Sequence, residues 1–167
     1  IEKIECIEDL LLIIDKYEYN EHYEYNIDFH SIVKIKYELD GLNNMVGMNR
    51  LKQNVLDQLL YFLQKLHLNK DGTSDYKHTV IYGPPGTGKT EIAKIIGRMY
   101  SKIGILSKNQ FIKVTRQDLV AGYLGQTAIK TSKVIDEAVG GVLFIDEAYS
   151  LASEEKDDSF SKECLDT

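Results

Sequence analysis

The sequence is poor in cysteine, and its two cysteines lie near opposite ends of the 167 residues. Neither Cys6 nor Cys164 belongs to a C-x-x-C pair or to a Cys/His spacing, and the four histidines form no ligand pattern. These absences exclude a zinc site of the usual ligand spacing. We expect both thiols to be free, as they are in a reducing compartment, and a disulfide between them is the alternative.

Long apolar runs are also missing. No segment approaches the roughly 18 apolar residues that a membrane-spanning helix needs. The short run Leu10–Ile14 is flanked by acids, which excludes a signal peptide. We therefore expect no membrane partner and a cytoplasmic location. Because the chain begins at Ile1 rather than at methionine, we expect it to be a piece of a longer protein.

The sequence also lacks an excess of positive charge. Lysine and arginine number 20 against 26 aspartates and glutamates, which gives a formal net charge of -6. This argues against a protein that binds nucleic acid by general basic attraction, although a small local basic site stays open. The apolar fraction of 43% is that of an ordinary globular protein long enough to form a core.

The chain has no internal repeat, and it divides into two regions. Residues 1–41 are interpreted as an N-terminal segment of helix and linker, beginning with an amphipathic helix over Ile4–Ile14. The tyrosine-rich stretch 17–26 fits a solvated linker or a partner surface, and the stretch 32–42 fits a helix or a strand. Residues 42–167 carry a much clearer pattern.

Helices and strands alternate along residues 42–167. We expect helix, strand, helix, strand, helix and strand over residues 49–68, 79–82, 91–100, 111–115, 128–138 and 142–145. Asn49 is a candidate cap for the first helix, because its side chain can accept a free backbone N–H. The last strand is apolar throughout, as buried strands of parallel sheets are. The pattern predicts a three-layer α/β fold with a parallel central sheet.

The stretch Gly83–Thr90 reads GPPGTGKT and matches the phosphate-loop pattern G-x-x-x-x-G-K-[ST], with a predicted strand before it and a helix after it. Gly86 and Gly88 relax the backbone so that it can curl round a phosphate at the helix N-terminus. Lys89 supplies a charge to the β and γ phosphates, and the Thr90 hydroxyl ligates magnesium. We expect the nucleotide to contact Pro85, Gly86, Thr87, Gly88, Lys89 and Thr90.

Two acids, Asp146 and Glu147, follow the apolar strand 142–145. Ligands of parallel sheets lie at the carboxyl ends of the strands, so these acids can face the pocket of the phosphate loop. Asp146 suits the magnesium shell, and Glu147 suits the general base that deprotonates the attacking water. A strand that exits into a polar loop is the alternative. With Lys89, the acids predict a catalytic site that hydrolyses ATP with Mg²⁺.

The motifs GPPGTGKT and LFIDEA resemble the Walker A and Walker B motifs of the AAA+ family of ATPases. Two further stretches, Leu119–Thr131 and Gly140–Tyr149, are similar to the group that contains red-type rubisco activase and stage V sporulation protein K. The resemblance covers the chain from about Leu42 to its end. Residues 42–167 are therefore interpreted as part of an AAA+ ATP-binding domain.

The resemblance implies a homo-oligomeric ring, commonly a hexamer, with ATP at the subunit interfaces. It places Tyr123 and Leu124 in a pore loop that pulls on a protein client, although a Tyr123 packed on its own domain is the alternative. It also makes Val46 and Gly47 contacts for the adenine, and it makes Thr115 a candidate sensor of the γ-phosphate.

The sequence stops at Thr167, before the family's sensor strand, arginine finger and helical lid. We therefore expect an incomplete copy of the fold. An arginine finger contributes roughly 10³–10⁵ in rate, so the chain alone should bind nucleotide but hydrolyse it poorly.

The leading interpretation of function is an ATPase that remodels a protein client. An AAA+ relative that acts on nucleic acid, such as a helicase loader, is an alternative that the acidic net charge and the stretch Tyr123–Gly125 weigh against. A nucleotide-dependent scaffold without hydrolysis is a second alternative, and Asp146 and Glu147 argue against it.

Overall fold

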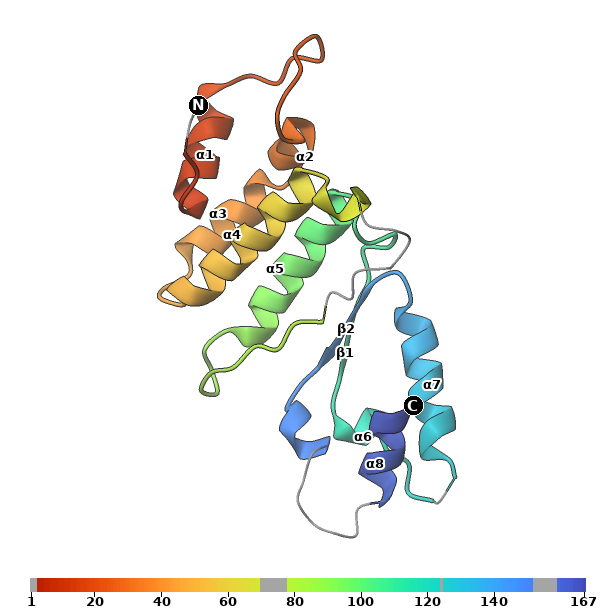
Figure 1. The fold of residues 1–167 in the computed structure, drawn as a ribbon. Coiled ribbons are helices and arrows are strands. Elements are labelled where there is room, and N and C mark those ends of the chain that lie inside the picture. The colour runs from red at the N-terminus through yellow and green to blue at the C-terminus, as the bar shows by residue number, and fades with distance from the viewer. Residues whose placement is uncertain (1–2, 70–77, 124, 152–158) are drawn as a thin grey trace. The chain divides into compact units, whose positions relative to one another are not determined.

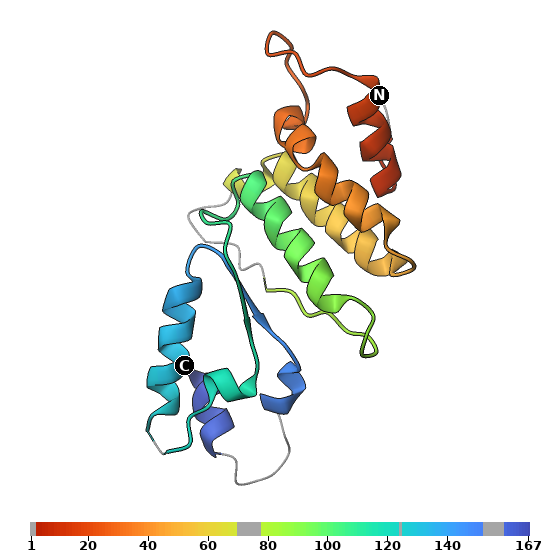
Figure 2. The same ribbon diagram turned by 180° about the vertical axis from the view of Figure 1, so that it is seen from behind.

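The computed structural model describes residues 3–69, 78–123, 125–151 and 159–167. The chain divides into two compact units, Ile1–Ile105 and Leu106–Thr167. Figures 1 and 2 draw the chain from opposite sides. In the described residues, the first unit is helical and the second contains a parallel pair of strands.

The first unit is a cluster of helices around an aliphatic interior. Its described elements are α1 (Ile7–Lys16), α2 (Phe29–Lys34), α3 (Lys36–Asn44), α4 (Asn49–Leu63), η1 (Leu66–Asn69) and α5 (Lys89–Lys102). Every α-helix contributes fully buried side chains, among them Leu10, Ile32, Leu39, Leu56, Leu59, Ile92 and Met99. Helix α3 packs along α5.

The stretch 32–42, which fits a helix or a strand by sequence, is helical. Helix α2 ends at Lys34 and α3 begins at Lys36, and Ile35 is the cap residue of both. The residues at helical spacing, Ile32, Ile35, Leu39 and Leu42, are buried, whereas Tyr37 is exposed. A period of three to four residues prevails because it places all four aliphatic side chains in the interior. The helix predicted over Ile4–Ile14 is confirmed by α1.

The predicted cap of α4 is wrong. Met48, not Asn49, occupies the cap position, and no side chain bonds the first turn of the helix. Gly47 and Met48 both have positive φ, at 76° and 57°. Because this left-handed turn ends at Met48, Asn49 is already the first helical residue.

The strand predicted over residues 79–82 is also wrong. The segment is not assigned to a strand, and Val80 and Tyr82 are 71% and 88% exposed. A strand forms where a neighbour completes its hydrogen-bonded ladder. None of the described residues pairs with this segment, so its β-forming sequence alone does not make it a strand.

The second unit contains the parallel strands that the sequence predicts. β1 (Phe111–Val114) pairs with β2 (Val142–Ile145), with Phe111 opposite Val142 and Val114 opposite Ile145. Helices α6 (Arg116–Leu119) and α7 (Thr127–Ala138) form the crossover, and η2 (Ala148–Leu151) and α8 (Ser159–Asp166) follow β2. Parallel neighbours require such a crossover. The α/β class and the parallel sheet are therefore confirmed.

The two strands bury one face within their own unit. Alternate residues Ile112, Val114 and Leu143 join a cluster with Leu119, Leu151 and Cys164. On the opposite face, the rings of Phe111 and Phe144 stack with centroids 5.7 Å apart. β2 is half-buried rather than fully buried as predicted, because a single strand flanks it among the described residues.

The boundary predicted between residues 41 and 42 falls inside α3, and it stays a prediction. Cys6 and Cys164 are both free thiols, as the sequence predicts. None of the described helices has the length and apolar character needed to cross a bilayer.

Candidate functional site

The phosphate loop Gly83–Thr90 has the backbone that its glycines were predicted to provide. Gly86 and Gly88 adopt φ angles of 77° and 83°, in the left-handed region that favours glycine. Gly88 is the N-cap of α5, and its carbonyl accepts the first helical bond, from the N–H of Ile92, at 3.0 Å. The N–H groups before Ile92 have no partner within the helix. The loop therefore ends at an anion-binding helix terminus.

Lys89 closes the phosphate loop from within. Its Nζ donates to the carbonyl oxygens of Gly83 and Pro84 at 2.9 and 2.7 Å. The Thr87 hydroxyl donates to the same Pro84 carbonyl at 2.9 Å. These bonds hold the ammonium within the loop, where the oxygens of a polyphosphate can replace the two carbonyls as hydrogen-bond acceptors. The residues present thus fit a bound polyphosphate.

The turn Met45–Met48, which carries the predicted adenine contacts, adjoins the phosphate loop. A Cβ placed on Gly88 would lie 3.2 Å from Cε of Met45. Val46 is 96% exposed, and Gly47 has a φ of 76°. The first unit therefore brings the base and phosphate candidates together. The role of Val46 and Gly47 stays a prediction.

Lys52 fixes this turn, and the sequence interpretation missed it. Its Nζ donates to the carbonyl oxygens of Asn43 and Met45 at 2.8 and 2.6 Å. Cations near a helix C-terminus bond its last carbonyls and favour its dipole. Lys52 thus caps the end of α3 from the first turn of α4. No sequence signal marked it beyond a lysine in an amphipathic helix.

Asp146 lies at the carboxyl end of β2, as predicted. Its N–H donates to the carbonyl of Val114 at 2.8 Å, which extends the ladder by one residue. Its Oδ2 lies 2.8 Å from Nζ of Lys113, and its Oδ1 accepts from the N–H of Glu147 at 3.1 Å. Lys113 alternates with the partly buried Ile112 and the buried Val114, and that alternation was the signal that could have found it.

Glu147 has an unusual backbone. Its φ is 53°, which is uncommon for a residue other than glycine and concentrates at functional sites. The charge of Glu147, followed by burial and a hydrogen bond to Glu147, raises the pKa of the Tyr149 hydroxyl. The Tyr149 hydroxyl thus donates a hydrogen bond to the Glu147 carboxylate. The sequence interpretation assigned no role to Tyr149.

Thr115 has a structural role that competes with the predicted sensing of phosphate. Its N–H and its hydroxyl both donate to Oδ2 of Asp118 at 2.8 Å, and they form a capping box at the start of α6. These bonds lower the pKa of Asp118. The T-x-x-D spacing could have revealed this cap. A γ-phosphate contact by Thr115 stays a prediction.

The candidate pore loop carries an exposed aromatic ring. Tyr123 is 74% exposed, and its carbonyl accepts from the N–H of Gln126 at 3.3 Å. Gly125 adopts a φ of 77°. A Tyr123 packed on its own unit is therefore excluded. Leu124 lies outside the described residues.

The predicted site residues fall in both units. Val46, Gly47 and the phosphate loop belong to the first unit, and Asp146 and Glu147 belong to the second. Across the described residues, no group of three His, Cys, Asp or Glu side chains converges as a metal cage. Magnesium characteristically takes one or two protein ligands together with phosphate oxygens. A shared magnesium site of Thr90 and Asp146 stays a prediction.

Lys113→Met should raise the apparent affinity for Mg²⁺ in the presence of ATP, because it frees the Asp146 carboxylate from a competing cation. The pair is partly exposed, so we expect an effect of roughly threefold to fivefold. Calorimetric titration of ATP at a series of magnesium concentrations measures it. Lys133→Met, which removes an exposed lysine of α7, is the matched control. An unchanged or weakened magnesium dependence in Lys113→Met would contradict the assignment of Asp146.

Residues 79–167 match the sequence pattern of the ATPase family associated with various cellular activities (AAA). This match covers more than half of the 167 residues. It begins just before the phosphate loop, and it includes both acids and the candidate pore loop.

Several individual proteins are similar to the chain. A cfxQ-like protein of Acanthamoeba polyphaga mimivirus is 40% identical over 142 residues, which cover 85% of this chain and 34% of that protein. Stage V sporulation protein K of Bacillus subtilis is 40% identical over 155 residues, covering 90% and 47%. The ESX-1 secretion system protein EccA1 of Mycolicibacterium smegmatis is 40% identical over 143 residues, covering 81% and 24%. The chain thus spans less than half the length of each of these relatives.

Proposed function

Because the chain belongs to the AAA family of ATPases, we propose that it binds ATP with magnesium and forms the hydrolytic core of a machine that remodels proteins. The observation that carries the proposal is the phosphate loop. Its left-handed glycines, the start of α5 and the inward Lys89 ammonium form a binding site for polyphosphate, to which the loop supplies hydrogen-bond donors.

Each site residue has a distinct role in this proposal. Lys89 exchanges its two loop carbonyls for β and γ phosphate oxygens. Thr90 and Asp146 hold magnesium, which neutralises charge on the phosphates when it is bound. Glu147 accepts the proton of the attacking water. Val46 and Gly47 contact the adenine.

The client is proposed to be a polypeptide. Two relatives are named as sporulation and secretion proteins, and the net charge of -6 is unfavourable for a polyanion. The exposed Tyr123 offers an apolar ring with a polar tip, which can grip varied sequences. We propose that this tyrosine lines the pore of a homo-oligomeric ring, and the resemblance to the family implies a hexamer.

Tyr123→Ala should abolish the stimulation of ATP turnover by an unfolded polypeptide, because the ring that grips the client is lost. Turnover without client should stay within about twofold, since Tyr123 lies outside the nucleotide machinery. The measurement is phosphate release by the assembled protein, with unfolded protein or single-stranded DNA added. Tyr37→Ala removes another exposed tyrosine and serves as the control. Stimulation by DNA instead of protein, or stimulation that survives Tyr123→Ala, would contradict the client assignment.

A further inference from the structure

We propose that Glu38 is a positioning residue for the base of the nucleotide. The ion pairs of its buried carboxylate fix the register of α3 along α5, and this register places the turn Met45–Met48 relative to the phosphate loop. The inference rests on the proposed ATP site, and it adds a determinant of base recognition in α3 that lies outside the nucleotide motifs.

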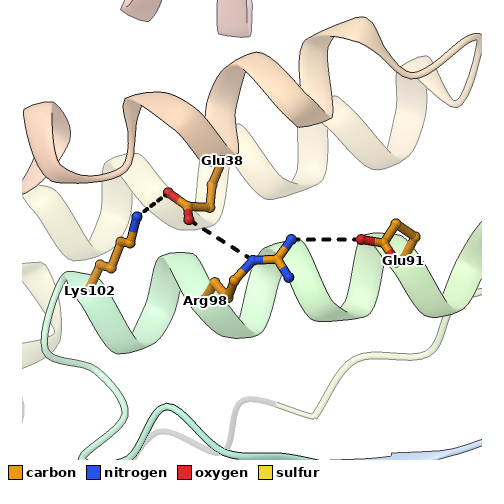
Figure 3. A network of polar contacts seen from close by, with 4 residues as sticks. All are labelled: Glu38, Glu91, Arg98 and Lys102. Carbon is orange, nitrogen blue, oxygen red and sulfur yellow. Dashed lines mark hydrogen bonds and ion pairs between the residues drawn. The ribbon is translucent and has the colours of Figure 1, made fainter.

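Glu38 is a buried carboxylate with two cationic partners on α5. It is 3% exposed, its Oε2 lies 2.8 Å from Nζ of Lys102, and its Oε1 lies 4.0 Å from Nε of Arg98. The other end of Arg98 reaches Glu91, at 3.7 Å from Nη2 to Oε1. Figure 3 shows this chain of contacts running from α3 along α5 toward its first turn.

Such a network is better suited to fixing a register than to adding stability. Removing a carboxylate from water costs several kcal/mol, and apolar replacements of buried ion pairs are often as stable. The aliphatic neighbours Leu39 and Leu42 could pack at more than one position along α5. A shift of α3 by one turn, about 5.4 Å, would move the buried Glu38 carboxylate away from Lys102, its closest cationic partner. The ion pair with Lys102 therefore favours the observed alignment.

This alignment is transmitted to the far end of the two helices. α3 and α5 are antiparallel, because Glu38 near the start of α3 meets Lys102 at the end of α5, whereas Met45 meets Gly88. Between these points, a Cβ on Gly41 would lie 3.8 Å from Cδ1 of Ile95, so the helices approach closely. A displacement of α3 would therefore carry the base-contacting turn with it.

The phosphate loop is less dependent on α3. Lys89 bonds the carbonyls of Gly83 and Pro84, and Thr87 bonds Pro84, so the curl is held by contacts within the loop. Loss of register should accordingly disturb the placement of the base while leaving the phosphate site formed. Binding of ATP and of inorganic tripolyphosphate separates these two effects.

The test compares these two ligands by calorimetric titration of the full chain. Glu38→Gln should weaken ATP binding about fivefold to tenfold, the cost of lost contacts to the base. The affinity for tripolyphosphate should stay within about twofold. Asp40→Asn, which removes one acid from the same helix, is the control and should change neither affinity.

A second variant keeps the test decisive if Glu38→Gln fails to fold. Glu38→Met combined with Lys102→Met replaces the closest ion pair by apolar side chains, so the double variant should fold. Its affinity for ATP should still fall, whereas its affinity for tripolyphosphate should not. Equal losses for both ligands, or full retention of ATP affinity in a folded variant, would overturn the inference. If the unmodified chain bound neither ligand, the proposed ATP site would fail, and this outcome is distinct from a failure of Glu38 alone.

Discussion

Glu147→Gln should retain ATP and lose its hydrolysis. The amide keeps the size of the side chain but cannot accept the proton of the attacking water. General base catalysis contributes roughly 10²–10⁴ in rate, and we expect a loss of that order. Phosphate release under single-turnover conditions measures the chemical step even where turnover is slow. Equilibrium binding of ATP should be unchanged or tighter.

The backbone of Glu147 makes glutamine a fair replacement. Both residues meet the same strain at a φ of 53°, so the comparison isolates the charge. The substitution should also lower the pKa of Tyr149, because the charge that raises it is removed. Ultraviolet titration of tyrosine ionisation would then shift to lower pH. Glu137→Gln, on the exposed side of α7, is the matched control. Hydrolysis at the unmodified rate in Glu147→Gln would eliminate this residue as the base.

Lys89→Ala should weaken the binding of ATP itself. The ammonium is the one full positive charge in the loop Gly83–Thr90. Hydrogen bonds to charged groups contribute about 1.5–3 kcal/mol each, and every 1.4 kcal/mol is tenfold in affinity. We therefore expect a loss of roughly tenfold to a hundredfold, measured by calorimetric titration at moderate ionic strength.

The matched control for this variant is Lys94→Ala. Lys94 lies on the same helix and pairs with Glu91 at 3.6 Å, so its loss changes the net charge equally without touching the loop. Binding that weakens to the same degree in both variants would indicate general electrostatic attraction rather than a specific contact. Unchanged binding in Lys89→Ala would contradict the phosphate loop as the ATP site.

The parts of the site that depend on local sequence could be predicted from it. Gly86 and Gly88 adopt positive φ as their pattern requires, and Asp146 lies at a strand end because the apolar run before it defines the strand. In both cases the chemistry is fixed by neighbours in the chain. For the same reason the helices α1, α5 and α7 match their periodic patterns.

The parts of the structure that depend on residues distant in the chain could not be predicted from the sequence. Residues 79–82 have a strand-forming sequence, but a ladder requires a neighbour that sequence does not identify. Glu38 looks like a surface acid until α3 is packed on α5. The pairing of Lys113 with Asp146 needs the register of β1 on β2, which a single sequence does not contain. Tertiary contact, not propensity, determined each of these.

The internal bonds of Lys89 have a consequence for the kinetics of the phosphate loop. A curl held by its own cation already has its bound shape when a ligand arrives. Association then requires an exchange of acceptors rather than the ordering of a chain, so its rate can approach that of rigid docking partners. Once the ligand dissociates, Lys89 again donates to the same two carbonyls, and the empty loop returns to the conformation that binds the next ligand.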